Sequence, residues 1–219
     1  MPSVPLLALS AVFHVLVGWR IAPDLSLYSP VAGVILWAWI TASTVVLPMG
    51  LVKPKFAGPR LANVLTWVGL IDMGIFSSTF VLMVLRELLL GVVSILHGIG
   101  VLQIPLDTLR IDSALLVGPL ALTMTLAGFW NARRTATVVR VDVPIANLPD
   151  SLQGFSIAQI SDIHVGPTIR ARYLQRIVER VNLLQADMVA ITGDLVDGPV
   201  KSLGGHIKAM LIKVHAPEA

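Results

Sequence analysis

Four long apolar segments occupy most of the first 131 residues of this 219-residue chain. A helix needs about 20 mostly apolar residues to cross the hydrocarbon core of a bilayer, and each segment is close to that length or longer. The segments cover residues 4–22, 28–52, 61–85 and 113–131. They predict a membrane α-helical bundle of about four spans and exclude an ordinary soluble fold for this part of the chain.

Two apolar stretches leave alternatives open. Residues 4–22 contain His14 and stop at Arg20, so a secretory signal competes with a membrane span, although the positively charged start of such signals is missing. Residues 86–105 are also apolar, but no loop separates them from the third segment. We predict a helical extension or an interfacial segment there, because a separate crossing would need a turn.

The character of the sequence changes near residue 133. The whole chain is 55% hydrophobic and 13% charged, whereas ordinary soluble domains are roughly 45–50% apolar. After residue 133, however, charged and apolar residues alternate as in soluble proteins. We therefore predict a transmembrane domain at residues 1–132 and a soluble part at residues 133–219. The absence of cysteine excludes disulfides and thiolate chemistry.

Lysine and arginine in the short connections predict the orientation, since basic loops stay in the cytoplasm. The connection between the second and third segments and the stretch after the fourth are the basic ones, with Lys53, Lys55, Arg60, Arg133, Arg134 and Arg140. The soluble part is therefore predicted to be cytoplasmic. Nucleic-acid binding is not expected despite the net charge of +3, because the basic residues flank apolar segments and are not interleaved with aromatics.

The soluble part shows a strand, helix, strand pattern. Residues 135–145 alternate as a half-exposed strand does, and residues 155–162 and 187–194 are short apolar runs typical of buried strands. Between the two buried runs, residues 169–184 repeat apolar side chains at helical spacing. A crossover through one helix makes its two strands parallel neighbours, and functional loops follow the carboxyl ends of such strands.

Acidic residues stand at both of these strand ends. Asp162 and His164 follow the first buried strand, and Asp194 follows the second. Parallel neighbours lie about 4.8 Å apart, so the two carboxylates would repel unless a cation joined them. Carboxylate and imidazole ligands suit Mn²⁺, Fe or Zn²⁺ better than Ca²⁺. The alternative is that Asp162 and Asp194 only end strands or cap helices.

The residues "DIH" at 162–164 and "GDLVDG" at 193–198 resemble the first two motifs of the calcineurin-like metallophosphoesterases. The apolar leader is similar to that of the members with a multi-span transmembrane N-terminus. The resemblance implies a two-sheet α/β sandwich, two divalent metal ions (Mn, Fe or Zn), and phosphoester hydrolysis by a metal-bound hydroxide. It implies that Asp162, His164 and Asp194 are metal ligands and that Asp197 orients the site from outside the coordination sphere.

The resemblance also has a gap. The family pattern continues with a Gly-Asn-His block and further histidines, and neither that block nor a Gly-His-x-His block occurs in the 219 residues. His206 and His215 are candidates to replace them, but they fall on or after an expected amphipathic helix, so surface histidines are the competing interpretation. We therefore expect residues 133–219 to be the N-terminal part of such a domain, truncated or frameshifted, with half of its site.

Three functions follow. The first is a membrane-anchored phosphoesterase acting on a phosphoester close to the bilayer; the second is a non-catalytic membrane protein that carries a remnant domain. The third is a transporter or sensor, for which paired charges and matched broken helices are missing. Asp72, in the middle of the third segment, is a functional candidate because of its depth. Alternatively, it faces the bundle and hydrogen-bonds Ser, Thr or His14 of a neighbouring helix.

Overall fold

The computed structural model describes residues 4–52, 54, 56–165 and 171–195. The chain divides into two compact units, Met1–Ala132 and Arg133–Ala219. We refer to them as the membrane unit and the soluble unit, and each is described by itself.

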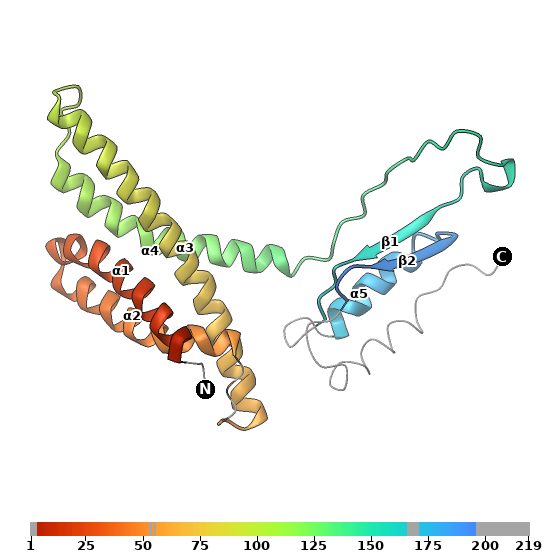
Figure 1. The fold of residues 1–219 in the computed structure, drawn as a ribbon, viewed down its shortest axis with the longest axis horizontal. Coiled ribbons are helices and arrows are strands. Elements are labelled where there is room, and N and C mark those ends of the chain that lie inside the picture. The colour runs from red at the N-terminus through yellow and green to blue at the C-terminus, as the bar shows by residue number, and fades with distance from the viewer. Residues whose placement is uncertain (1–3, 53, 55, 166–170, 196–219) are drawn as a thin grey trace. The chain divides into compact units, whose positions relative to one another are not determined.

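The membrane unit consists of four helices, α1 (Val4–Tyr28), α2 (Pro30–Leu51), α3 (Pro59–Gly98) and α4 (Leu106–Ala132) (Figure 1). All four are long and apolar enough to cross a membrane. α1 and α2 form a hairpin whose turn is the single residue Ser29. Ser29 is extended because Pro30 follows it, and Pro30 has the fixed φ that suits the first position of a helix. The predicted membrane bundle is confirmed.

Helix α3 settles the question of residues 86–105. It continues without a break to Gly98 and has 40 residues, which corresponds to roughly 60 Å of helix. The hydrocarbon core is only about 30 Å thick, so α3 extends well beyond it. The helical extension is therefore the correct interpretation up to Gly98.

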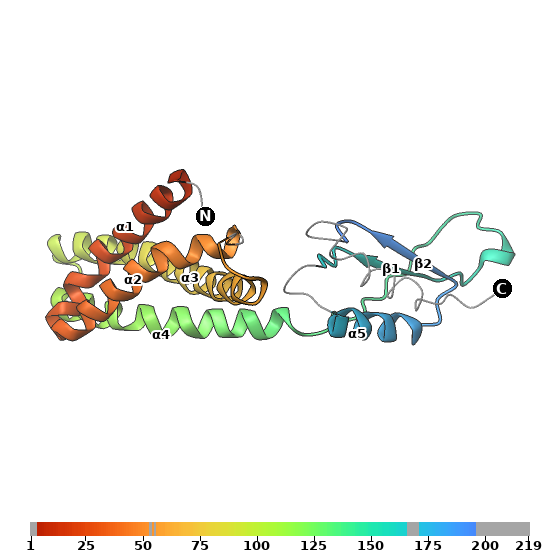
Figure 2. The same ribbon diagram turned by 90° about the horizontal axis from the view of Figure 1, so that it is seen from below.

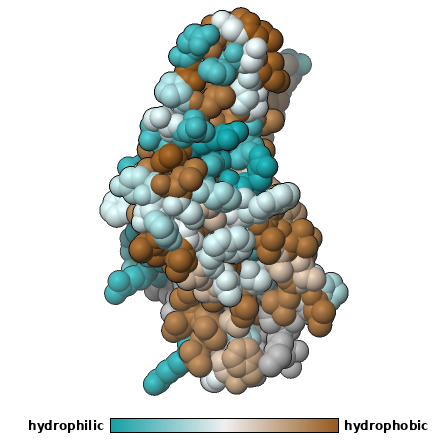
Figure 3. Space-filling view, turned by 90° about the vertical axis from the view of Figure 1, so that its left-hand side faces the viewer, coloured by the Kyte–Doolittle hydropathy of each residue, from teal (hydrophilic) through white to brown (hydrophobic). Residues whose placement is uncertain are grey.

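The helices pack around a small apolar core, and most of their apolar surface is exposed. The core of the membrane unit contains Val17, Ile21, Ile40, Phe76, Met83, Ala114 and Val117. Only 17–22% of the most apolar window of each helix is buried, and the face seen in Figure 3 carries large areas of hydrophobic side chains. In water such a surface would be unstable, whereas lipid is its natural surrounding.

One charged cluster ties three of the helices together. Arg86 of α3 is 5% exposed, and its guanidinium donates to Asp24 of α1 and to Glu87 at 2.8 Å. It also donates to Ser113 Oγ of α4 at 2.9 Å, and Glu87 pairs with Arg20 of α1. The two arginines and two carboxylates cancel in charge, and the paired carboxylates allow the Arg86 guanidinium to be buried.

The soluble unit contains the predicted strand, helix, strand sequence. Strand β1 (Ile157–Ser161) pairs in parallel with β2 (Met188–Thr192), with Ile157 opposite Met188 and Ser161 opposite Thr192. Helix α5 (Ala171–Asn182) connects them, and a 3-10 turn, η1 (Asp150–Leu152), precedes β1. Figure 2 shows α5 along one face of the strand pair. The predicted fold class, a helical membrane bundle followed by a partial α/β domain, is confirmed.

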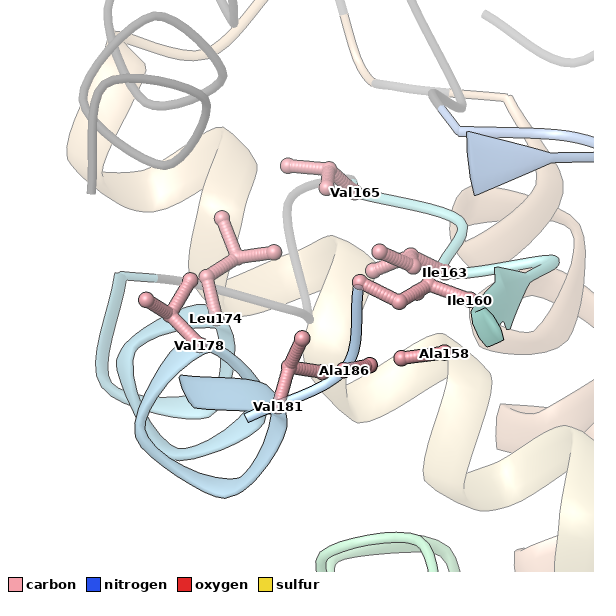
Figure 4. Close-up of a cluster of buried hydrophobic side chains, with 8 residues drawn as sticks. All are labelled: Ala158, Ile160, Ile163, Val165, Leu174, Val178, Val181 and Ala186. Carbon is pink, nitrogen blue, oxygen red and sulfur yellow. The ribbon is translucent and has the colours of Figure 1, made fainter. Parts of the chain in front are cut away.

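A single apolar layer joins α5 to the strands. Alternate residues of β1, Ala158 and Ile160, point into it, and Figure 4 shows them opposite the side chains of α5. The buried set is Ala158, Ile160, Ile163, Val165, Leu174, Val178, Val181 and Ala186. This layer fixes the strand ends on which the candidate site is built.

The strand expected at residues 135–145 does not form. Val139, Val141 and Val143 alternate with polar residues but are 70–79% exposed, and the segment has no regular secondary structure. A strand needs a neighbour for its N–H and C=O groups. Among the described residues, β1 and β2 pair only with each other.

Candidate metal centre

The carboxyl ends of β1 and β2 bring the main chains of the predicted ligands together. The parallel pairing continues past the strands, because the N–H of His164 donates to the carbonyl of Asp194 at 3.0 Å and the N–H of Val165 to Leu195 at 2.9 Å. Asp162 and His164 therefore lie opposite the Gly193–Asp194 turn. This is the edge at which open parallel sheets carry their sites.

The Asp162 carboxylate at this edge is held by two hydrogen bonds. Its Oδ1 accepts the backbone N–H of Asp194 at 3.2 Å, and the Ser161 hydroxyl donates to Oδ2. The Ser161 hydroxyl and then the Asp194 N–H lower the pKa of the Asp162 carboxyl below its ordinary value, because both bonds favour the charged form. The carboxylate is therefore ionised, as a cation ligand must be, throughout the neutral range.

Gly193 makes room for this carboxylate. Its φ is +69°, and a Cβ at this position would lie 2.4 Å from Asp162 Oδ1. A side chain would therefore be strained by the backbone conformation and would also collide with the acid. Gly193 thus has a local explanation: it lets the turn approach Asp162 closely enough for the Asp162 carboxylate to accept the backbone N–H of residue 194.

The backbone at the end of β1 adopts an uncommon conformation. Asp162 has φ 53° and His164 has φ 52°, both in the left-handed region that most residues avoid and that Asn, Asp and His enter more readily. Such positions typically cost about 1–3 kcal/mol and cluster at functional sites. Two of them within three residues turn the chain sharply at the edge where the ligands are expected.

The side chains do not converge into a complete site within the described residues. There, no group of three or more His, Asp or Glu side chains lies close enough together to hold a metal ion. Asp197, His206 and His215 lie outside the described residues. The donor types fit a divalent cation, since two aspartates and a histidine follow the strands at one sheet edge, but the described part of the chain supplies only a portion of a ligand shell.

Sequence reasoning missed an acid at the opposite end of the strands. Asp187 Oδ2 accepts the backbone N–H and the hydroxyl of Ser156, each at 2.7 Å. The Ser156 hydroxyl first, and then its N–H, lower the pKa of the Asp187 carboxyl. The signal available was that a serine and an aspartate each precede a buried run, which places them opposite one another once the strands are parallel.

A shallow pocket of about 270 Å³ was also not predicted from the sequence. Arg176 and Arg180 of α5 line it together with Glu179 and Thr135, and Arg176 donates to the carbonyl of Arg133 at 3.5 Å. The signal was the spacing of arginines by four residues at 172, 176 and 180, which places them on one face of a helix.

Sequence comparison decides the relationship. A transmembrane protein with a metallophosphoesterase domain from Danio rerio is 46% identical over 86 residues, which are 38% of this chain and 20% of that protein. The chain is a homologue of that protein. A protein of the same description from Bos taurus is 36% identical over 80 residues, covering 36% of this chain and 18% of its own length.

A bacterial relative extends the comparison. An uncharacterized metallophosphoesterase from Campylobacter jejuni is 36% identical over 91 residues, which are 42% of this chain and 24% of that protein. The chain thus spans about a fifth of the length of the curated relatives that it matches. No family model matches the chain, and no solved structure matches it.

The four apolar helices and the transmembrane relatives agree that the chain is a membrane protein. The predicted resemblance is confirmed to this extent: the chain has homologues described as transmembrane proteins with a metallophosphoesterase domain, and the similarity covers only part of each chain.

Proposed function

We propose that the chain is a membrane-anchored member of the metal-dependent phosphoesterases and that its soluble unit contributes Asp162, His164 and Asp194 to a divalent metal centre. The observation that carries this proposal is the meeting of Asp162 with the Gly193–Asp194 turn at the carboxyl ends of two parallel strands. The similarity to metallophosphoesterases of three organisms supports it.

In this proposal the chain's own residues act as a preorganised half of the site. Ser161 and the Asp194 N–H orient the Asp162 carboxylate. Gly193 has no Cβ, so it leaves the space beside this carboxylate free of a side chain. A divalent cation bound there would supply positive charge to a phosphoester oxygen. Asp197 is proposed to orient the ligands from outside the coordination sphere, and Mn, Fe and Zn are the metals that suit the donor set.

The soluble unit is proposed to face the cytoplasm, with the lipid bilayer as its permanent partner and a phosphoester near the membrane surface as its substrate. The basic residues in the connection between α2 and α3 and those after α4 support that orientation. Residues 133–219 are proposed as the phosphoesterase part and residues 1–132 as the anchor.

A non-catalytic role is the second candidate. It is favoured by one observation, namely that no three described His, Asp or Glu side chains converge on a common point. Such a chain would keep the fold of the strand ends without the complete ligand shell that two cations need.

Manganese binding tests the proposal. The purified full-length chain in detergent is titrated with Mn²⁺, and free Mn²⁺ is followed by its electron paramagnetic resonance signal. We expect one weak site per chain, which is lost in Asp162→Asn and in Asp194→Asn. Asparagine tolerates the left-handed conformation of residue 162, so the exchange removes charge without breaking the turn.

Asp187→Asn is the matched control, because it removes a carboxylate from the other end of the same strands. Equal Mn²⁺ binding by all three variants and the wild type would refute the proposed ligands. Two tightly bound ions per chain would show that the ligand set extends to His206 and His215.

Activity separates the two candidates. With Mn²⁺ and a chromogenic bis-aryl phosphate, we expect no turnover by the 219-residue chain, because the Gly-Asn-His block of the family pattern does not occur in its sequence. Extension with the C-terminal half of a homologous domain should produce turnover that requires Asp162 and Asp194. Metal binding without turnover in the extended chain would favour the non-catalytic role.

A further inference from the structure

A chain of hydrogen bonds crosses the interior of the membrane unit from α1 through α2 to α3. His14 of α1 is fully buried, and its Nε2 lies 2.8 Å from Ser43 Oγ of α2. Ser43 Oγ in turn lies 2.5 Å from Asp72 Oδ2 of α3. Two titratable groups on different helices are thus connected through one hydroxyl that is 1% exposed.

The cluster lies far from both ends of the membrane-spanning part of α3. Asp72 is twelve residues after Arg60 and fourteen before Arg86, which corresponds to roughly 18 Å and 21 Å along the helix axis. It is therefore near the middle of the hydrocarbon core. A net charge at that depth is strongly disfavoured unless a partner compensates it.

The outer contacts of the cluster fix the position of one proton. The Ser10 hydroxyl donates its hydrogen to the carbonyl of Thr44 at 3.1 Å. His14 Nδ1 lies 2.7 Å from the carbonyl of Ser10, and a carbonyl can only accept. Nδ1 must therefore carry a hydrogen. Because a neutral imidazole has only one N–H, Nε2 carries a hydrogen only when His14 is a charged imidazolium.

The other side of the cluster is equally constrained. Trp39 Nε1, which can only donate, lies 3.1 Å from Asp72 Oδ1, so Oδ1 accepts. The Ser43 hydroxyl has one hydrogen for two partners, Asp72 Oδ2 and His14 Nε2. Whichever partner receives that hydrogen, the other must donate to the Ser43 oxygen.

Only two arrangements satisfy every contact. In the first, Asp72 is ionised, Ser43 donates to it, and His14 is an imidazolium that donates to Ser43. In the second, Asp72 is protonated and donates to Ser43, which donates to a neutral His14. Each arrangement contains one proton shared between Asp72 and His14, and each is neutral overall.

We propose that His14, Ser43 and Asp72 form a proton-binding site inside the membrane unit, in which one proton moves between the Asp72 carboxylate and the His14 imidazole through the Ser43 hydroxyl. The transfer balances: the Asp72 proton passes to the Ser43 oxygen as the Ser43 proton passes to His14 Nε2, and the hydroxyl is restored.

The surroundings isolate this proton. Phe76 stacks on the His14 ring with 3.7 Å between ring centroids. From α4, Thr125 lies beside Gly74 and Ser78 of α3 and adds no titratable group. Within the described residues, the hydrogen bonds of the cluster include no titratable side chain besides His14 and Asp72. The charged residues of α3 that come next along the helix are Arg60, twelve residues before Asp72, and Arg86, fourteen residues after it.

The order of the three residues excludes a nucleophilic triad. In a Ser-His-Asp triad the imidazole lies between the hydroxyl and the carboxylate, where it takes the proton of the nucleophile. Here the hydroxyl lies between the other two and is buried. The arrangement suits exchange of a proton within the cluster.

The test counts protons in the full-length chain reconstituted in lipid nanodiscs. Infrared spectroscopy gives the fraction of protonated Asp72 from the carboxylic-acid band that Asp72→Asn removes. Nitrogen NMR of histidine-labelled protein gives the fraction of His14 imidazolium from the signal that His14→Gln removes. Between about pH 6 and 8, where free Asp is ionised and free His titrates, we expect the two fractions to add up to one.

Ser43→Ala and Thr41→Ala make a matched pair on α2. Both remove one hydroxyl, but Thr41 bonds only the carbonyl of Trp37 in its own helix. In Ser43→Ala the sum should depart from one and vary with pH, while Thr41→Ala should keep the wild-type sum. A wild-type sum near zero or two, or unchanged sums in Ser43→Ala with the fold intact by tryptophan fluorescence, would overturn the proposal.

Discussion

Replacement of Arg86 by methionine should destabilise the membrane unit by about 3 kcal/mol. The methionine keeps most of the packing volume but removes a guanidinium that is 3% exposed at its side chain. Glu87 keeps Arg20 as a partner, whereas Asp24, whose side chain is 17% exposed, loses the arginine that pairs with it. Removing one partner of a buried pair typically costs about 3–5 kcal/mol, and the residual exposure of Asp24 places this case at the lower end.

The double variant Arg86→Met with Asp24→Asn separates the ion pair from the packing. It removes the uncompensated carboxylate, so it should recover part of the loss, with a coupling energy within the range of about 0.5–3 kcal/mol seen for contacting residues. Arg110→Met is the matched control. Arg110 is exposed and contributes its backbone carbonyl to the cluster, so its replacement should change stability by less than about 0.5 kcal/mol.

Tryptophan fluorescence is a suitable signal for this measurement. All five tryptophans, at positions 19, 37, 39, 67 and 130, lie in the membrane unit. Unfolding of the detergent-solubilised chain by added denaturing detergent therefore reports on that unit alone. Coinciding unfolding curves for wild type, Arg86→Met and Arg110→Met would refute the argument, and a double variant no more stable than Arg86→Met would show that Asp24 is not the source of the loss.

Two further predictions concern the soluble unit and the orientation. Because Ser156 lowers the pKa of Asp187 from its ordinary 3.8, the stability that this carboxylate provides is complete above that value and is lost as the pH falls through the lower folded-state pKa. Hydrogen-exchange protection of β1 and β2, corrected for the intrinsic exchange rate, should therefore fall on acidification. The fall should be smaller in Asp187→Asn than in the wild type, and an equal dependence of protection on pH in both proteins would contradict this. Reporter fusions after Phe56 and after Arg140 should both report the cytoplasm, and fusions on opposite sides would disprove a four-span topology with both sites inside.

The membrane helices were predictable because length and apolar character decide them locally. The four predicted segments correspond to α1 to α4, and of the two alternatives predicted after residue 85, a helical extension or an interfacial segment, the helical extension forms as far as Gly98. The two strands were predictable for a similar reason, since a short apolar run flanked by turn residues has few alternatives. The prediction of a strand at 135–145 was wrong, because a strand needs a neighbouring strand to pair with and the local sequence pattern carries no information about that neighbour.

The contacts between elements were the part that the sequence could not provide. His14 and Asp72 were both noticed as polar residues in apolar segments, and the suggestion that Asp72 faces the bundle was correct. However, Ser43 joins them, and nothing distinguishes Ser43 from other small polar residues until the helix packing is known. At the sheet edge, adjacency of the strand ends could be predicted, whereas the left-handed conformation of Asp162 and His164 could not.

The bonds of Asp72 also bear on how the protein enters the membrane during synthesis. An aspartate at the centre of an inserting helix costs about 2.5–3.5 kcal/mol, so Asp72 opposes the insertion of α3 as long as its carboxyl group has no partner. Trp39 and Ser43, the two side chains that hydrogen-bond the Asp72 carboxyl group, belong to α2, which leaves the ribosome immediately before α3. Insertion of α2 and α3 as a hairpin would satisfy the acid before lipid surrounds it, which ties the folding of this anchor to the order in which its helices are translated.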